Sequence, residues 1–367
     1  MDKRFEYMRV AAAVPSLKVA DPNYNKKEIA AVALRAAEED ARVLVFPELS
    51  MTGYTCQDLF CQITLIDECE EALSFLLEET KYLNMLIAVG MPVKADNQLF
   101  NCAVVFKDGK ILGVIPKTYV PNYKEFYEQR WFASSANRIS DTIYLCEQEV
   151  IFNENLLFKD NLSSLCIGID VCEDLWVSIP PSSYHTIYGA NLILNLSASN
   201  EIVGKADYRR DLVKMQSSKC ITSYVYSSSG EEESTTDLVY SGHCMIAENG
   251  KILEEDNLSD GFIYSDIDLE KINSERYNRN SYMGNIEKRN YNYFNLGCNE
   301  KAELERFVDP RPFVPPIEDR DRRLSDILNI QATGLCQRMK KINAKKAIIG
   351  ISGGLDKKKK IKGKIIL

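Results

Sequence analysis

LCIGIDVCEDLW, residues 165–176, is the stretch that decides the fold of this 367-residue chain. Its first seven residues form a nearly continuous apolar run, which is typical of a β-strand buried on both faces. Cys172 follows the run directly, so it is expected on a turn at the edge of the sheet. A strand of this kind needs another layer on each face, which is characteristic of α/β proteins.

Similar apolar runs alternate with amphipathic segments on both sides of this strand. Strands are predicted at residues 9–14, 42–46, 85–90, 190–196, 221–227 and 261–267, and helices at 26–40, 63–82 and 207–219. The dipeptides Asp108-Gly109 and Asn249-Gly250 stand between apolar runs and favour the positive φ angles of a hairpin turn. The order of elements predicts mixed α/β layers, with two packed sheets covered by helices.

The composition excludes several classes of function. The chain carries 45 Lys and Arg against 53 Asp and Glu, a net charge of −8, which argues against nucleic-acid or anionic-membrane partners. Its apolar stretches are shorter than the ~20 residues of a membrane helix, so we expect a cytoplasmic protein. Eleven cysteines without metal-type spacing and only two histidines argue against a zinc site or a histidine base. These exclusions leave Cys, Lys and Glu side chains as the candidate catalytic groups.

Cys172 is the first candidate for a catalytic group. A thiol attacks acyl and amide carbons when a neighbouring base or cation raises its thiolate fraction. Taken alone, a cysteine at a strand end is more often a buried and unreactive thiol. A metal bound by Asp170, Glu173 and Asp174 is a further alternative, because all three are oxygen ligands.

Two more candidates stand where other predicted strands end. Glu48 follows the strand at 42–46, where active sites form in α/β folds, and partial burial would suit it to general-base work. Lys117 ends the second strand of the hairpin at Asp108-Gly109, where it could stabilise an oxyanion. Taken singly, each is more often a surface charge.

Together these residues carry a resemblance to a known family. FPELSMTGY (46–54), PKTYVPNYKEFYEQRWF (116–132) and GIDVCEDLW (168–176) resemble the Glu-Lys-Cys motifs of the nitrilase superfamily of carbon–nitrogen hydrolases. The middle motif is similar to the glutaminase domain of glutamine-dependent NAD+ synthetases. PFVPPIEDR (312–320), ILNIQATGL (327–335) and IIGISGGLD (348–356) resemble the linker and first phosphate loop of the same family.

The resemblance implies a role for each catalytic candidate. Cys172 would attack the side-chain amide of glutamine and form a thioester. Glu48 would take the thiol proton, pass it to the leaving ammonia and then activate water. Lys117 would stabilise the tetrahedral oxyanion, and Glu128 would be an additional carboxylate that orients the site.

The resemblance also implies residues that hold glutamine. Tyr123, Ser199 and Lys205 match positions that bind the substrate in this family. Their types suit the polar ends of an amino acid, and Lys205 would pair with the α-carboxylate. The alternative is that Ser199 caps a loop and Lys205 is a solvated charge.

The C-terminal stretch matches an ATP-binding loop only in part. Ser352, Gly353, Gly354 and Asp356 would begin a loop that binds pyrophosphate through backbone N–H groups. In the family a serine follows the aspartate, whereas Lys357 stands there in this chain and a lysine-rich end follows. We expect this end to be truncated or shifted in reading frame, and unable to bind ATP productively.

The expected architecture is a four-layer α-β-β-α sandwich of the nitrilase type at residues 6–272. A linker arm with a connecting helix would follow at 273–345, and a truncated start of the synthetase domain at 346–367. The chain would hydrolyse glutamine to glutamate and ammonia with no cofactor and no metal. In the intact family, ATP and Mg²⁺ then serve to amidate nicotinic acid adenine dinucleotide to NAD+. Nitrilase-type domains commonly form oligomers, so a homo-oligomer is expected.

Two other functions remain open from the sequence. The chain could be a free-standing amidase of the same superfamily that acts on another amide. It could also be a catalytically silent module that serves in assembly. Comparing the turnover of glutamine with that of simple aliphatic amides distinguishes a general amidase from a glutaminase. A Cys172 that reacts with thiol reagents in an oligomer without catalytic activity would favour the assembly module.

Overall fold

The computed structural model describes residues 6–282, 288–296, 304–346 and 348, with the exception of 312, 316 and 318. The chain divides into two compact units, Met1–Arg306 and Phe307–Leu367. The first unit therefore continues beyond residue 272, where the sequence places the end of the first domain.

One six-stranded sheet combines the first five strands of the chain with a strand from residues 261–268. Its strand order is β16-β1-β2-β3-β4-β5. The central pairs β1–β2 and β2–β3 are parallel, and the outer pairs are antiparallel. The strands are β1 (Tyr7–Val14), β2 (Val43–Val45), β3 (Leu86–Ala95), β4 (Gln98–Lys107), β5 (Lys110–Pro116) and β16 (Gly261–Asp268).

A second, seven-stranded sheet contains the stretch from which the sequence analysis began. Its order is β15-β14-β13-β12-β11-β10-β17. The central strands β11, β12 and β13 are parallel to one another. The strands are β10 (Leu156–Lys159), β11 (Cys166–Val171), β12 (Leu192–Ser197), β13 (Ser223–Ser228), β14 (His243–Glu248), β15 (Lys251–Asn257) and β17 (Asn292–Asn295).

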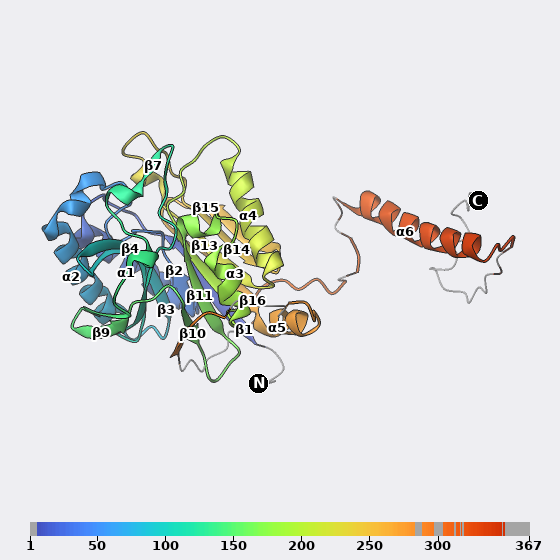
Figure 1. The fold of residues 1–367 in the computed structure, drawn as a ribbon, viewed down its shortest axis with the longest axis horizontal. Coiled ribbons are helices and arrows are strands. Elements are labelled where there is room, and N and C mark those ends of the chain that lie inside the picture. The colour runs from blue at the N-terminus through green and yellow to red at the C-terminus, as the bar shows by residue number, and fades with distance from the viewer. Residues whose placement is uncertain are drawn as a thin grey trace. The chain divides into compact units, whose positions relative to one another are not determined.

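Helices cover the outer faces of the two sheets. In Figure 1, α1 (Pro22–Glu38) and α2 (Ile63–Thr80) lie beside the first sheet, while α3 (Pro181–Ile187) and α4 (Lys205–Lys219) lie beside the second. A further helix, α5 (Leu269–Tyr277), follows β16. The order helix, sheet, sheet, helix agrees with the predicted fold class.

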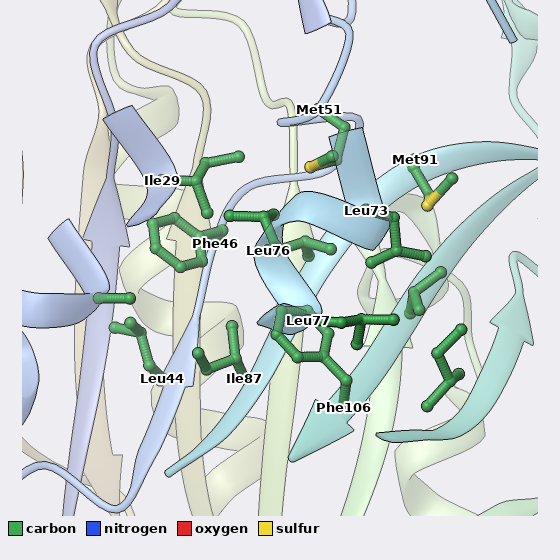
Figure 2. Close-up of a cluster of buried hydrophobic side chains, with 14 of the residues drawn as sticks. Ile29, Leu44, Phe46, Met51, Leu73, Leu76, Leu77, Ile87, Met91 and Phe106 are labelled. Carbon is green, nitrogen blue, oxygen red and sulfur yellow. The ribbon is translucent and has the colours of Figure 1, made fainter. Parts of the chain in front are cut away.

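Alternating side chains on each strand fill separate hydrophobic cores. On β1, Val10 and Ala12 belong to the core between the sheets, whereas Ala11 and Ala13 belong to the core under α1 and α2. Figure 2 shows this helix-side core, in which Phe46 and Ile87 of the sheet lie near Leu76 of α2. Because both faces are covered, these strands read as continuous apolar runs.

Most predicted elements are confirmed, with shifts of a few residues at their ends. Both predicted hairpins form, β4–β5 and β14–β15, and their turn residues have positive φ angles, for example 52° at Asp108 and 45° at Asn249. The sequence analysis missed α3, α5, β10 and β17. It also missed the short ribbons β6–β7 (Asn122–Tyr123, Phe126–Tyr127) and β8–β9 (Thr142–Leu145, Gln148–Ile151). Short 3₁₀ turns complete the first unit: Gln57–Cys61, Glu128–Arg130, Ser135–Asn137, Cys172–Leu175 and Glu231–Glu233.

The second unit contains one long helix, α6 (Arg320–Lys341), which agrees with the helix expected in the connecting segment. The expected start of the synthetase domain at 346–367 lies outside the described residues except for 346 and 348, so Ser352, Gly353, Gly354 and Asp356 are not described. Throughout the described ranges, we find no helix that combines the length and the apolar character needed to cross a membrane.

Candidate active site

The ends of three strands bring the principal candidates to one site. Glu48 stands three residues after β2, Lys117 directly follows β5, and Cys172 directly follows β11. β2 and β5 belong to the first sheet and β11 to the second, so the site lies where the two sheets meet. The backbone N–H of Glu48 donates a hydrogen bond of 3.2 Å to the carbonyl of Ser197, at the end of β12.

Lys117 joins two glutamates in the interior. Its Nζ lies 2.6 Å from Oε1 of Glu48, and 2.9 and 2.8 Å from the two carboxylate oxygens of Glu128. All three side chains are buried, with exposed fractions of 0, 0 and 2%. Two carboxylates around one cation leave this cluster with a formal charge of −1. Such a group is tolerated inside a protein because every charge has a partner at contact distance.

The carboxylate of Glu48 keeps one oxygen available. Its Oε1 also accepts a hydrogen bond of 2.6 Å from Asn101 Nδ2. Its other oxygen, Oε2, is buried, and no donor within the described part of the chain reaches it. Buried carboxylate oxygens normally have a partner. An unsatisfied oxygen beside a thiol is therefore the group to which a proton can go.

Cys172 occupies a strained turn. Its φ angle is +46°, in the left-handed region that side chains rarely adopt. It begins the 3₁₀ turn Cys172–Leu175. Strain of this kind persists only where the surroundings hold it, and it concentrates at functional sites. The turn fixes the direction of the sulfur at the sheet edge.

The surroundings keep the Cys172 thiol protonated at rest. Burial and the negative charge of Glu48 raise the pKa of the thiol well above its ordinary value, although Lys117 opposes this. A thiol in this state needs a base at the moment of attack. For Lys117 itself, burial would lower the pKa. The charges of Glu128 and Glu48 outweigh burial and hold the Lys117 pKa well above its usual range, so the ammonium stays charged.

Glu128 is positioned from a distant part of the chain. Its carboxylate accepts a hydrogen bond of 2.8 Å from the Tyr54 hydroxyl. Burial raises the pKa of Glu128, while Lys117 and Tyr54 counteract that rise. The backbone N–H groups of Tyr54 and Thr55 in turn donate to the buried carboxylate of Glu233. A loop of the second sheet thus supports a carboxylate of the site.

The residues expected to hold substrate lie around the same strand ends. The Tyr123 hydroxyl donates a hydrogen bond of 2.8 Å to Glu173, the residue after Cys172. Ser199 is buried; its hydroxyl has no hydrogen-bond partner among the described residues. Lys205 begins α4, donates to Asn200 Oδ1 and is half-buried.

Lys205 is held among aromatic rings. Its ammonium lies 5.2 Å from the ring centre of Trp176 and 5.5 Å from that of Phe126. Burial lowers the pKa of Lys205, and the charge on Cys172 would raise it. This environment does not match a freely solvated surface charge, which was the alternative reading of the sequence.

An open cavity lies beside Tyr123 and Glu173. It has a volume of about 1040 Å³, and Tyr123, Glu173 and Thr118 are among its lining residues. The cavity is large enough for an amino acid to approach the strand ends. Across the described ranges, no group of three or more Cys, His, Asp or Glu side chains could hold a metal ion, so the structure gives no support to the alternative of a metal at Asp170, Glu173 and Asp174.

Sequence reasoning missed the contacts of four supporting residues: Asn101, Tyr54, Glu233 and Asp174, the last of which it considered only as a metal ligand. Tyr54 and Asp174 stand inside the quoted motifs, but nothing in one sequence shows which partner each residue meets. Glu233 contacts Tyr54 and Thr55 across 179 and 178 residues of chain. Periodicity carries no information about contacts at that separation.

Comparisons with known proteins agree with this architecture. The glutamine-dependent NAD(+) synthetase of Mycobacterium bovis is 35% identical over 95% of this chain and 53% of its own length. A crystal structure of a glutamine-dependent NAD(+) synthetase from Cytophaga hutchinsonii superposes with a TM-score of 0.62 and 26% identity, covering 71% of this chain and 43% of that one.

A smaller protein shows the same fold. Saccharomyces cerevisiae Nit3, a member of branch 10 of the nitrilase superfamily, superposes with a TM-score of 0.58 and 19% identity, over 76% of this chain and 97% of Nit3. The chain spans about half the length of the curated synthetase of Mycobacterium bovis that it matches. The family model for carbon-nitrogen hydrolases matches residues 9–277, which include every described strand end at the site. The chain therefore belongs to the carbon–nitrogen hydrolase family.

Proposed function

We propose that this chain hydrolyses the side-chain amide of glutamine to glutamate and ammonia, with Cys172 as nucleophile. The observation that carries the proposal is the buried Glu48–Lys117–Glu128 cluster beside a protonated thiol on a strained turn. A thiol, a base with a free oxygen and a fixed cation are the groups that acyl transfer from an amide requires.

In the first half of the reaction, Oε2 of Glu48 takes the proton of Cys172 as the sulfur attacks the amide carbon. The carbonyl electron pair moves to oxygen, and the Lys117 ammonium stabilises the resulting negative charge. The carbon–nitrogen bond then breaks, and Glu48 gives its proton to the nitrogen. Ammonia leaves, and the acyl group remains on Cys172 as a thioester.

In the second half, water attacks the thioester carbon while Glu48 accepts a proton from it. The carbon–sulfur bond breaks, glutamate leaves and the proton returns to the sulfur of Cys172. Glu128 touches no reacting atom in this scheme. It holds Lys117 in place by accepting hydrogen bonds from the same ammonium that contacts Glu48.

Recognition of the amino-acid part falls to polar groups near the mouth of the site. Lys205 supplies a cation for the α-carboxylate, and the Glu173 carboxylate with the Tyr123 hydroxyl offers acceptors for the α-ammonium. The unpartnered Ser199 hydroxyl is available to either end. This arrangement favours glutamine over an aliphatic amide, which has no charged ends.

The relatives that match nearly the whole chain are named for a glutamine-dependent NAD(+) synthetase. We therefore propose that the ammonia is used to form NAD+. ATP, Mg²⁺ and nicotinic acid adenine dinucleotide would then be used beyond residue 345, and residues 273–345 would connect the two parts. We further propose a homo-oligomer in the cytoplasm. For the glutaminase step itself we propose neither metal nor cofactor.

The test is glutamate and ammonia release from glutamine by the purified chain, beside the Cys172→Ala and Cys61→Ala variants. Cys61 is exposed, unlike the buried Cys172, so its variant should keep full activity. Added hydroxylamine should yield γ-glutamyl hydroxamate from the thioester in the wild type, and none in Cys172→Ala. Faster turnover of aliphatic amides than of glutamine would favour a general amidase. No release from either substrate would refute the enzymatic proposal and leave the assembly module.

A further inference from the structure

One buried carboxyl group links the two loops that carry the nucleophile and the cation. Asp174 accepts a hydrogen bond of 3.0 Å from the backbone N–H of Val171 and one of 2.9 Å from that of Tyr119. Val171 precedes Cys172, and Tyr119 lies two residues after Lys117. The Asp174 side chain is buried, so water does not compete for these donors. We propose that Asp174 is a positioning residue that fixes the Cys172 turn relative to Lys117.

The bond to Val171 restrains the strained turn itself. Asp174 is the third residue of the turn Cys172–Leu175, and its side chain reaches back to the N–H of the residue before the turn. This is the reciprocal half of a capping box, which stabilises the start of a helical turn. The left-handed φ of Cys172 falls inside the closed loop, so opening that bond would let the sulfur change direction.

The bond to Tyr119 joins the two sheets at the site. Cys172 follows a strand of the second sheet, and Lys117 follows a strand of the first. Asp174 and Tyr119 are 55 residues apart in the chain. The nucleophile and the cation therefore share one anchor. Asp174 makes no contact with the reacting atoms, so it acts through its two backbone partners.

Both partners are N–H donors, which makes the carboxyl group hard to replace. Burial and the neighbouring Asp170 raise the pKa of Asp174 to about 8, against the two N–H groups that favour the charged form. In either protonation state, both carboxyl oxygens keep a lone pair for a donor. The amide of asparagine has one acceptor oxygen, and its NH₂ group would face an N–H.

Asp170 offers a matched control. It is equally buried, but its oxygens accept from the N–H of Ser182 and from the hydroxyl of Tyr224, at 2.9 Å each. A hydroxyl can reverse its role and accept from an amide NH₂. The Asp170→Asn variant can therefore keep both hydrogen bonds, whereas Asp174→Asn loses one of them.

The experiment compares Asp174→Asn, Asp174→Glu and Asp170→Asn with the wild type. This inference rests on the proposed glutaminase function, so glutamine turnover is measured with hydrogen exchange of the Val171 and Tyr119 amides at single-residue resolution. In Asp174→Asn, we expect kcat per folded molecule to fall at least tenfold with KM changed less than threefold. At least one of the two amides should exchange at least tenfold faster. Asp174→Glu, which keeps two acceptors, should retain more activity, and Asp170→Asn should keep kcat within threefold.

Equal loss of kcat in Asp174→Asn and Asp170→Asn would overturn the proposal. The loss would then follow from removing any buried carboxyl group near Cys172, and not from the bonds of Asp174 to Val171 and Tyr119. Unchanged exchange at both amides in Asp174→Asn would also overturn it. If Asp174→Asn does not fold, Asp174→Glu decides. A fall in kcat while both amides exchange as in the wild type, or faster exchange with an unchanged kcat, would then overturn the proposal. If the wild type releases no glutamate, the proposed function fails, and amide exchange alone tests whether Asp174 fixes the turn.

Discussion

Replacing Lys117 by methionine should destabilise the protein strongly, because it leaves two buried carboxylates without their cation. Lys117 has no exposed surface and contacts Glu48 and Glu128 at 2.6 and 2.8 Å. Removing one partner of a buried ion pair costs about 3–5 kcal/mol. Methionine has a similar length, so the loss reports the missing charge rather than a cavity. Lys107→Met is the control, since Lys107 is also buried but its partner Asp108 is 53% exposed. That variant should lose about 1 kcal/mol or less.

The loss in Lys117→Met should also depend on pH, with a sign that the structure fixes. Burial raises the pKa of Glu128, and Lys117 opposes that rise, so removing Lys117 raises the Glu128 pKa further. Between the two pKa values, Glu128 is then protonated in the native state and ionised in the unfolded state. Stability should therefore fall as pH rises from the ordinary pKa of a glutamate, about 4.5, toward the raised native pKa. The slope is at most about 1.4 kcal/mol per pH unit for one proton.

Urea unfolding at several pH values between 5 and 8 measures both effects. The free energy of unfolding of Lys117→Met should be closest to that of the wild type at pH 5 and furthest below it at pH 8. Glutamine turnover should be lost at every pH, because no cation remains for the oxyanion. The reasoning is refuted if Lys117→Met unfolds no more easily than Lys107→Met, or if its deficit relative to the wild type does not change with pH.

Two further substitutions test how the site is supported. Gly90→Ala should lower the free energy of unfolding by about 1–3 kcal/mol and abolish glutamine turnover. A Cβ there would lie 2.1 Å from the backbone nitrogen of the residue after Glu48. In the control Gly113→Ala, the Cβ would meet side chains alone, the end of Leu156 and the ring of Phe158. Equal activity of the two variants would contradict the argument. Tyr54→Phe should lower turnover about tenfold, since a hydrogen bond to a charged group contributes about 1.5–3 kcal/mol. Tyr264→Phe should leave turnover unchanged, because it removes a tyrosine–glutamate hydrogen bond of 3.1 Å to Glu39 at the surface.

The sequence predicts the strands better than the contacts between their ends. The apolar runs around Cys172 are long enough to locate a buried strand, and Asn-Gly and Asp-Gly mark hairpins through backbone conformation alone. The helix α3 escaped notice because Pro180 and Pro181 look like a break. Proline is in fact suited to the first turn of a helix, where Pro181 stands. β17 has no apolar alternation to reveal it, since three of its four residues are exposed.

The candidate site could be located but not assembled from one sequence. Strand ends indicate Glu48, Lys117 and Cys172, because α/β folds gather functional groups there. The link from Lys117 to Glu128 entered only through the resemblance to a family. The supports behind them depend on how loops of both sheets meet in space, as Tyr54 and Glu233 show. Local periodicity does not contain that information.

The position of the site at the junction of two sheets explains why its supports come from so far along the chain. The first sheet carries Glu48 and Lys117, the proposed base and cation, and the second carries Cys172, the proposed nucleophile. Their relative placement depends on the apolar core between the sheets, where Val45 and Ile169 belong to one cluster. A close-packed core resists gradual deformation, so it holds the two sheets in one relative position. The polar links at the rim, Asp174 between the strand-end loops and Glu233 beneath Tyr54, then set the final alignment. The core thus brings the sheets together, and a few buried carboxyl groups fix the geometry of the chemistry.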